Sequence, residues 1–552
     1  MKSKMNELKF IALSGTVGVT ENLYIYESED KMMIIDCGVG FPDIEMHGVD
    51  LVIPDFTYII ENKHKLSGVV LTQGHEDHIG ALPFLLREVN VQLWAAPLVK
   101  EFLKDKFEDY KVKDPVINMF NPDSDCFKVG PFTLYPFRVA HSVPDSVGFA
   151  IDTPQGRVFH VPEHKMDQNP VDGMGFDLQR AKDLVGDKIL FLASDCLGSN
   201  KPGYTKSELG IEKNMYEITR EAKEAVYMTA ISSNIGRFQQ MVNVAQNTGR
   251  KVVFVGRSIQ RKTEIAFNLG YLKYKKGTVI TPKQAERYSR SDLLYIVSGC
   301  YGQVGSSLYK ISLGEHDRID IQKGDTMIFS ADPAPPYTKE SEDFVVDNLI
   351  EKGVDVHYYD TDEGLYVSGH GGQEDIKDLF RLTNPKYYIP IGGTIRFMHS
   401  YKKLAVDFGA EPSNVFEMKP GESLIFENGV ARKGKRLPSK KVLVHGLGIG
   451  DVGKVVLGDR GILGNEGIAV TVIKLRNGKI VGIPEIISRG FVFEKIEKGF
   501  LKKAGLELKK EIDKTGKFEK DTIKKTSENF LTKYFFDRIG RKPMILPVTV
   551  EI

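Results

Sequence analysis

Cysteine is scarce in this chain of 552 residues, and the four that occur lie far apart: Cys37, Cys126, Cys196 and Cys300. None of them forms a C-x-x-C pair, so the spacing argues against both a disulfide framework and a zinc ribbon. Unpaired cysteines of this kind are typical of a reducing compartment, and we expect a cytoplasmic protein.

Long hydrophobic runs are also missing. The N-terminal MKSKMNELKFIALSG holds too short an apolar stretch for a signal peptide. Further along, no run approaches the ~20 apolar residues that a membrane helix needs. We therefore expect no membrane partner.

An excess of charge of either sign is absent, because 75 basic residues nearly balance 74 acidic ones. Net charge therefore does not favour a polyanionic partner, and any nucleic-acid surface must be a local patch. At this length the chain exceeds what one hydrophobic core usually organises, so we expect about two to four domains.

What the sequence does contain is one turn crowded with ionisable groups, between Ser67 and Leu86. An apolar run at 69–71 predicts a buried strand, and the segment from Gly80 predicts the start of a helix. The turn between them carries Gln73, His75, Glu76, Asp77 and His78. Imidazoles and carboxylates at a strand end suit a hydrolytic Zn or Mn site. A solvated loop with hydrogen-bonded histidines is the alternative.

Two later strand ends carry further candidate ligands. His141 follows an alternating strand pattern over 132–140, and Glu163 follows a strand predicted over 156–161. His141 alone would suit a structural role. Beside the crowded turn, it is the next strand-end ligand that such a site requires.

The remainder of the chain alternates between strands and helices. Hairpin strands are predicted from Lys9 to Asp36, and the alternation over 206–358 predicts a doubly wound parallel sheet. The basic segment 432–441 is a solvated tether or a phosphate contact. Beyond it, the predicted strands are AVTVIKL, KIVGIPEII and MILPVTV, together with a helical stretch over about 496–534.

The crowded turn resembles the H-x-H-x-D-H signature of the metallo-β-lactamase superfamily, with Gln73 in place of the first histidine. Longer strings, among them GVDLVIPDFTY, AHSVPDSVGFAI, LYVSGHGGQED and GLGIGDVGKVVLGDR, are similar to ribonuclease J. This family of β-CASP nucleases matches from about Lys9 to Ile552. The resemblance implies an α/β protein: a metallo-β-lactamase αββα sandwich, an inserted β-CASP α/β domain and a small C-terminal α+β domain. The expected lactamase domain covers 1–205 and 359–430, with β-CASP at 206–358, a linker at 431–441 and the C-terminal domain at 442–552.

The resemblance also implies hydrolysis of single-stranded RNA by up to two Zn or Mn ions. One ion would use positions 73, 75 and 141, the other 77, 78 and 392, with position 163 bridging them. Gln73 and Gly392 do not match the family pattern, and Glu163 stands for an aspartate. The metal ligands still expected are His75, Asp77, His78, His141 and Glu163, and the expected catalytic residues are Asp77 and His370.

Several polar groups of the same pattern suit RNA phosphates. They are Ser232, Ser233, Arg237, Arg257, Ser258, Ser368, Gly369 and His370. Structural roles explain many of them equally well, since Arg257 and Ser258 would also begin a helix. For His370 we favour RNA binding, because the glycines on either side permit close approach. Further departures from the family pattern in the expected cleft lie at 18–22, 299–303, 336–340 and Tyr366.

Two hypotheses follow. In the first, which we favour, the chain is a catalytically impaired paralogue that binds RNA and assembles as a homodimer or with an active ribonuclease J homologue. In the second, it is an active 5′–3′ exo- and endoribonuclease that works with one metal. Whether His160 or His164 replaces a lost ligand stays open at this stage. The matched β-CASP insertion argues against a small-molecule hydrolase.

Overall fold

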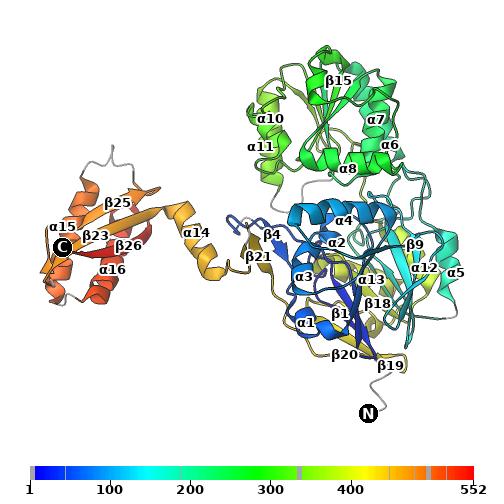
Figure 1. Cartoon of the computed structure of the whole chain (residues 1–552), viewed down its shortest axis with the longest axis horizontal. Coiled ribbons are helices and arrows are strands. Elements are labelled where there is room, and N and C mark those ends of the chain that lie inside the picture. Colours follow the sequence, from blue (N-terminus) through cyan, green and yellow to red (C-terminus); the bar gives the residue numbers. More distant parts are fainter. Residues whose placement is uncertain are drawn as a thin grey trace. The chain divides into compact units, whose positions relative to one another are not determined.

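The computed structural model describes residues 7–552 except 44, 187, 332–337, 447, 478, 493–498 and 517–518. The chain forms two compact units, one of Met1–Phe41 with Val52–Val442 and one of Pro42–Leu51 with Leu443–Ile552. Figure 1 labels their elements. The altered turn at 336–340 and the predicted helix start at Ile496 lie partly outside the described residues.

The lactamase domain of the first unit contains two large β-sheets. The larger has the strand order β20-β19-β1-β2-β3-β5-β6-β7, and the smaller has the order β18-β12-β11-β10-β9-β8. The larger sheet consists of β1 (Leu8–Ala12), β2 (Tyr24–Ser28), β3 (Lys31–Ile35), β5 (Leu66–Val70), β6 (Leu93–Ala95), β7 (Ile117–Met119), β19 (Glu422–Glu427) and β20 (Val430–Lys433). The smaller consists of β8 (Phe127–Val129), β9 (Phe132–Arg138), β10 (Val147–Thr153), β11 (Gly156–Val161), β12 (Ile189–Asp195) and β18 (Tyr387–Ile391).

Aromatic side chains pack these two sheets against each other. The Phe191 ring of β12 lies 5.4 Å from Phe10 and 4.9 Å from Phe426, between ring centroids. Every residue of β12 is buried, as expected for a central strand with parallel neighbours. Helices cover the outer faces: α5 (Leu178–Val185), α12 (Gln373–Thr383) and α13 (Ile395–Asp407) on the smaller sheet, and α1 (Thr57–Glu61), α3 (Leu82–Glu88) and α4 (Pro97–Tyr110) beside the larger (Figure 1). The predicted αββα sandwich is confirmed.

The inserted domain has a wholly parallel sheet in the order β14-β15-β13-β16-β17. Its strands are β13 (Val226–Thr229), β14 (Lys251–Val255), β15 (Leu293–Val297), β16 (Thr326–Phe329) and β17 (Asp355–His357). The helices include α6 (Leu209–Glu221), α7 (Ile235–Asn247), α8 (Arg257–Asn268), α10 (Ser307–Leu313) and α11 (Lys339–Glu351). The predicted doubly wound pattern is confirmed. The carboxyl ends of all these strands meet at one edge of the sheet.

The second unit packs two helices on a sheet built around β23 (Ile468–Arg476). This strand pairs with β24 (Lys479–Ile480) and β25 (Glu485–Arg489) and, in parallel, with β26 (Met544–Glu551). The helices α15 (Phe500–Thr515) and α16 (Lys520–Ile539) share one apolar core with β23. Among the helices that the structure describes, none is long and apolar enough to cross a membrane.

Three details differ from the sequence-based predictions. The stretch KIVGIPEII is two strands, because Gly482 has φ +77° and Pro484 lacks the amide donor that a continuous ladder needs. The single helix predicted over 496–534 is two helices, α15 and α16. The first ends at Gly516, where φ is +61°. The expected linker begins inside β20.

A buried ionic network joins the inserted domain to the lactamase sheets. Glu208 accepts from Lys165 Nζ at 3.3 Å and from Arg237 Nη2 at 3.1 Å. Arg237 also donates to the carbonyl oxygens of Ser330 and Leu365. With only 1% of its surface exposed, Arg237 has a structural position, and its proposed role as a phosphate ligand is not supported. Attraction to the two cations lowers the pKa of Glu208 against the opposing effect of burial.

We predict that Glu208→Ala destabilises the protein strongly, because it leaves Lys165 and Arg237 buried without their shared carboxylate. Removing one partner from such a network costs about 3–5 kcal/mol in the free energy of unfolding, measurable by urea denaturation. The control is Glu221→Ala, since that side chain is 79% exposed. An equally small effect of both substitutions would contradict this role.

Candidate metal centre

The crowded turn lies at the carboxyl end of β5, between β3 and β6. His75 is the N-cap residue of the short helix α2 (Glu76–Ile79), so Asp77 and His78 sit in its first turn. The backbone of Gly38 packs directly on this helix, since a Cβ there would lie 1.5 Å from the Asp77 carbonyl oxygen. A glycine at position 38 therefore fixes how deeply the turn is set into the sheet.

Asp36, at the end of β3, orients His78. Its carboxylate lies 2.7 Å from His78 Nδ1 and accepts from the backbone N–H and the hydroxyl of Thr72 at 2.9 and 2.6 Å. Because Nδ1 faces this carboxylate, Nε2 is the nitrogen that points into the centre. A carboxylate behind an imidazole is the usual support for a metal-binding histidine.

Asp77, His78 and Glu163 form a group whose ligand atoms all lie within 4.8 Å of one another. His78 Nε2 is 3.6 Å from Asp77 Oδ2 and 3.5 Å from Glu163 Oε1. One imidazole and two carboxylates suit a divalent cation such as Zn or Mn. These three residues therefore fit one metal ion.

The electrostatics of the group agree with a cation site. Burial and the nearby Glu163 raise the pKa of Asp77 to about 7. Burial works against ionised Glu163 as well, but the imidazoles of His78 and His141 hold its pKa well below the usual value. Two neighbouring buried carboxyl groups repel each other when both are ionised. A bound cation would stabilise both negative charges.

Two ligands expected for a second metal, His75 and His141, lie near each other, with ring centroids 5.1 Å apart, but their nitrogens face other partners. Both ring nitrogens of His75 face serine hydroxyls, Nδ1 at 2.6 Å from Ser233 and Nε2 at 2.7 Å from Ser142. His141 does reach the centre, with Nε2 3.0 Å from Glu163 Oε2, and its Nδ1 lies 3.0 Å from the Gly369 carbonyl. Position 392 is a glycine with φ +67° and offers no ligand atom.

Neither nearby histidine replaces a lost ligand. His160 Nδ1 lies 3.0 Å from the Tyr26 hydroxyl, between the sheets, where burial lowers its pKa to about 3. His164 Nδ1 lies 3.0 Å from the Pro162 carbonyl, and its ring packs against Phe176. Both rings are therefore held by other contacts, outside the group of three.

The residues expected to bind RNA lie at strand ends and in one glycine-rich turn. Ser232 and Ser233 follow β13, and the exposed pair Arg257 and Ser258 begins α8 after β14, with the Ser258 and Ser232 hydroxyls 3.4 Å apart. Ser233 extends to His75, so this edge of the inserted sheet adjoins the metal turn. The structure brings these residues near one another and near the centre.

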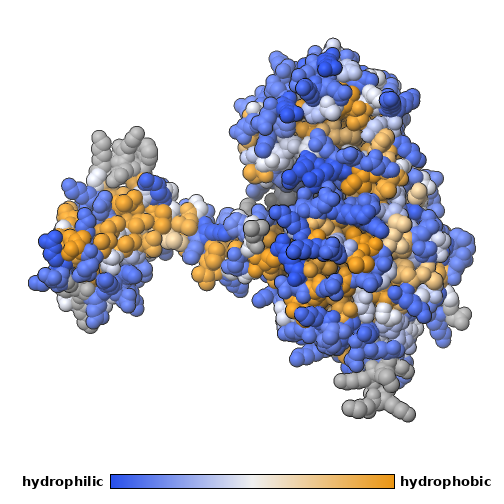
Figure 2. Space-filling model, in the orientation of Figure 1, coloured by the Kyte–Doolittle hydropathy of each residue, from blue (hydrophilic) through white to orange (hydrophobic). Residues whose placement is uncertain are grey.

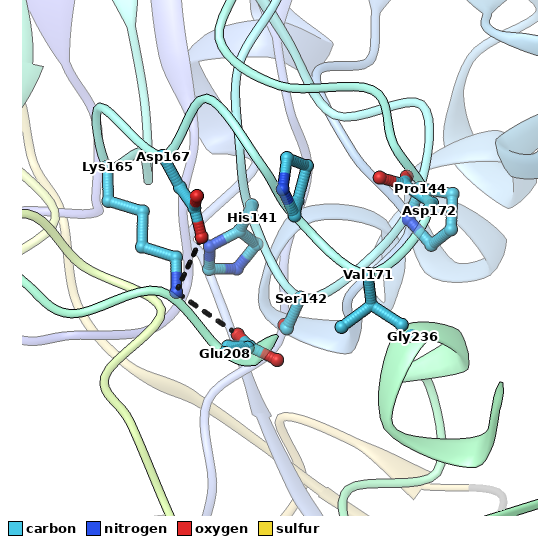
Figure 3. Close-up of a pocket in the computed structure, with 10 residues that line it drawn as sticks. His141, Ser142, Pro144, Lys165, Asp167, Val171, Asp172, Glu208 and Gly236 are labelled. Carbon is cyan, nitrogen blue, oxygen red and sulfur yellow. Dashed lines mark hydrogen bonds and ion pairs between the residues drawn. The ribbon is translucent and has the colours of Figure 1, made fainter. Parts of the chain in front are cut away.

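The turn at 368–370 approaches the centre at His141, whose Nδ1 faces the Gly369 carbonyl. The His370 N–H donates to the Ser368 hydroxyl, and His370 Nδ1 lies 2.7 Å from Asp195 Oδ2. The His370 ring is 5.7 Å from that of His141, between centroids. Behind His141, a cavity of about 20 Å³ bordered by Ser142, Lys165 and Glu208 has room for about one water molecule and not for a nucleotide (Figure 3).

Sequence reasoning missed the supporting residues Asp36, Asn22, Ser142 and Asp195. The signal for Asp36 and Asp195 was present, because both are carboxylates at the ends of buried strands, as the expected ligands are. Asn22, which lies 3.2 Å from both Asp77 Oδ2 and His78 Nε2, carries no such signal. Only the folded chain brings it beside the turn.

Comparison with known proteins agrees with this architecture. Residues 33–179 match the profile described as the beta-lactamase superfamily domain, residues 223–349 match the ribonuclease J beta-CASP domain, and residues 455–552 match the ribonuclease J C-terminal domain. A solved structure from Enterococcus faecalis V583, described as a protein of unknown function, shares the fold with a TM-score of 0.54 and 15% identity. It covers 76% of this chain and 100% of its own.

Ribonucleases J of three bacteria match over at least 98% of their own length. Ribonuclease J 1 of Streptococcus pyogenes serotype M3 is 32% identical over 99% of this chain and 98% of its own. Ribonuclease J2 of Bacillus subtilis strain 168 is 31% identical, and ribonuclease J 2 of Staphylococcus saprophyticus is 33% identical, each over 100% of both chains. This chain belongs to the ribonuclease J family.

Proposed function

We propose that this protein takes part in RNA processing and decay as a catalytically impaired member of its family. It binds single-stranded RNA and assembles with itself or with an active ribonuclease J homologue. The observation that carries the proposal is that Gln73 and Gly392 supply no imidazole, while both ring nitrogens of His75 are engaged by serine hydroxyls. Two-metal hydrolysis needs both ions to stabilise the attacking and the leaving oxygen.

RNA binding is supported by the polar groups that surround the centre. The exposed Arg257 guanidinium and the hydroxyls of Ser232 and Ser258 present donors of the kind that hold phosphates. The turn of Ser368, Gly369 and His370 adjoins the same centre through His141. These contacts are independent of any metal, so RNA affinity does not require turnover.

The alternative is an active nuclease with one metal, and the convergence of Asp77, His78 and Glu163 favours it. When bound, the metal would neutralise charge on the phosphodiester. Asp77 and Glu163 would hold it, with His78 oriented by Asp36. His370, held by Asp195, would be the group to transfer a proton to the leaving oxygen.

We predict that the wild-type protein binds 5′-labelled single-stranded RNA in the presence of Mn²⁺ or Zn²⁺ without multiple turnover. Arg257→Ala should weaken binding and reduce the salt slope of log K by about one, because one phosphate contact is lost. Arg287→Ala, an exposed arginine away from these strand ends, serves as the control. Multiple turnover that His78→Ala abolishes would instead establish the alternative.

Assembly is supported by an uncovered apolar face on the second unit. In β23 and β26, Val470 pairs with Leu546 and Val472 with Val548, while the helices cover the opposite face of the sheet. The exposed members of this face are Ile487, Leu546, Val548 and Val550. Figure 2 shows hydrophobic side chains gathered over these strands. A contiguous exposed apolar patch of this kind is typical of a protein interface.

We predict that Val548→Lys weakens oligomer formation, because it places a charge in the middle of the apolar face. Size-exclusion chromatography with light scattering should show a lower mass, whether the protein is measured alone or mixed with an active homologue. Lys502→Glu, on the exposed side of α15, should leave the mass unchanged. An unaltered oligomer for Val548→Lys would refute the use of this face.

A further inference from the structure

Gln73 lies inside the group of metal-capable side chains rather than beside it. Only 1% of its surface is exposed. Its side-chain nitrogen Nε2 is 2.6 Å from Glu163 Oε2 and 3.0 Å from His78 Nε2. These two acceptors are atoms that a metal would need as ligands.

Chemistry fixes which end of the Gln73 amide faces the centre. With the amide reversed, its oxygen would stand 2.6 Å from a carboxylate oxygen, a repulsive contact between two acceptors. The observed orientation leaves Gln73 Oε1 buried, with no hydrogen-bond partner in the described part of the chain. The inward group is therefore an N–H donor, which cannot bind a metal ion.

His78 has the arrangement that metal binding requires, but its ligand atom is engaged. Asp36 holds Nδ1, and Nε2 faces two amide nitrogens, Gln73 at 3.0 Å and Asn22 at 3.2 Å. Amide nitrogens only donate, so Nε2 accepts from them in the neutral tautomer whose proton lies on Nδ1, against Asp36. Glu163 Oε2 is likewise engaged by Gln73 and His141.

We propose that the Gln73 carboxamide is an internal replacement for the metal ion. Its N–H groups occupy the lone pairs of His78 and Glu163, so that the centre folds and stays closed in an ion-free form. This inference deepens the function proposed above. It rests on that proposal for one point, that hydrolysis is impaired. Gly392 only removes a ligand, whereas Gln73 also fills the space between the remaining ones.

The test is divalent metal binding by the full-length protein. Mn²⁺ and Zn²⁺ are titrated by calorimetry, and bound metal is measured by elemental analysis, for wild type and for Gln73→Ala. We expect Gln73→Ala to bind one ion about 10-fold or more tightly than wild type. Adding Asp77→Asn to this variant should abolish the gain. Gln179→Ala, an exposed glutamine on α5, should behave as wild type.

Two outcomes would overturn the proposal: wild type that binds one ion as tightly as Gln73→Ala, or a folded Gln73→Ala that gains no affinity. Thermal unfolding monitors the folded state, and Gln73→Ser is a second variant if Gln73→Ala does not fold. RNA affinity measured in EDTA separates the two claims. Loss of all RNA binding by wild type would refute the proposed function, and the metal titration would still decide the role of Gln73.

Discussion

The buried carboxylate of Glu163 is the interaction on which this centre depends. It receives the Gln73 amide at 2.6 Å and lies 3.0 Å from His141 Nε2, and it lies within reach of His78. An unpaired carboxylate at this depth would be costly, so the surrounding N–H groups stabilise its charge. The same carboxylate would bridge ions in a two-metal enzyme. In this protein, hydrogen-bond donors surround the Glu163 carboxylate instead.

The turn at 73–78 also contacts the inserted domain. Glu76 pairs with Lys106 of α4 at 2.6 Å and with Lys262 of α8 at 3.7 Å, while Ser233 holds His75. The turn at 73–78 therefore also helps to hold the inserted domain in place. The His75 and Glu76 side chains therefore have a structural role whether or not hydrolysis occurs.

Much of the fold could be predicted from the sequence, because strand periodicity and turn residues are local signals. The parallel inserted sheet and the hairpins of the first sheet follow from such patterns. The break at Gly482 was harder to predict, since the apolar pattern continues across it. For the site, Asp77, His78, His141 and Glu163 were all placed at the centre. The pairing of His75 with two serines was not predictable, because it joins positions up to 158 residues apart.

The central claim is that the Gln73 amide, and not an ion, lies between His78 and Glu163. Crystals of the wild-type protein grown with Mn²⁺ and measured by anomalous scattering test it directly. The account predicts no anomalous peak within the group of Asp77, His78 and Glu163, with the Gln73 amide in place. A fully occupied peak about 2.0–2.2 Å from these three side chains would contradict it.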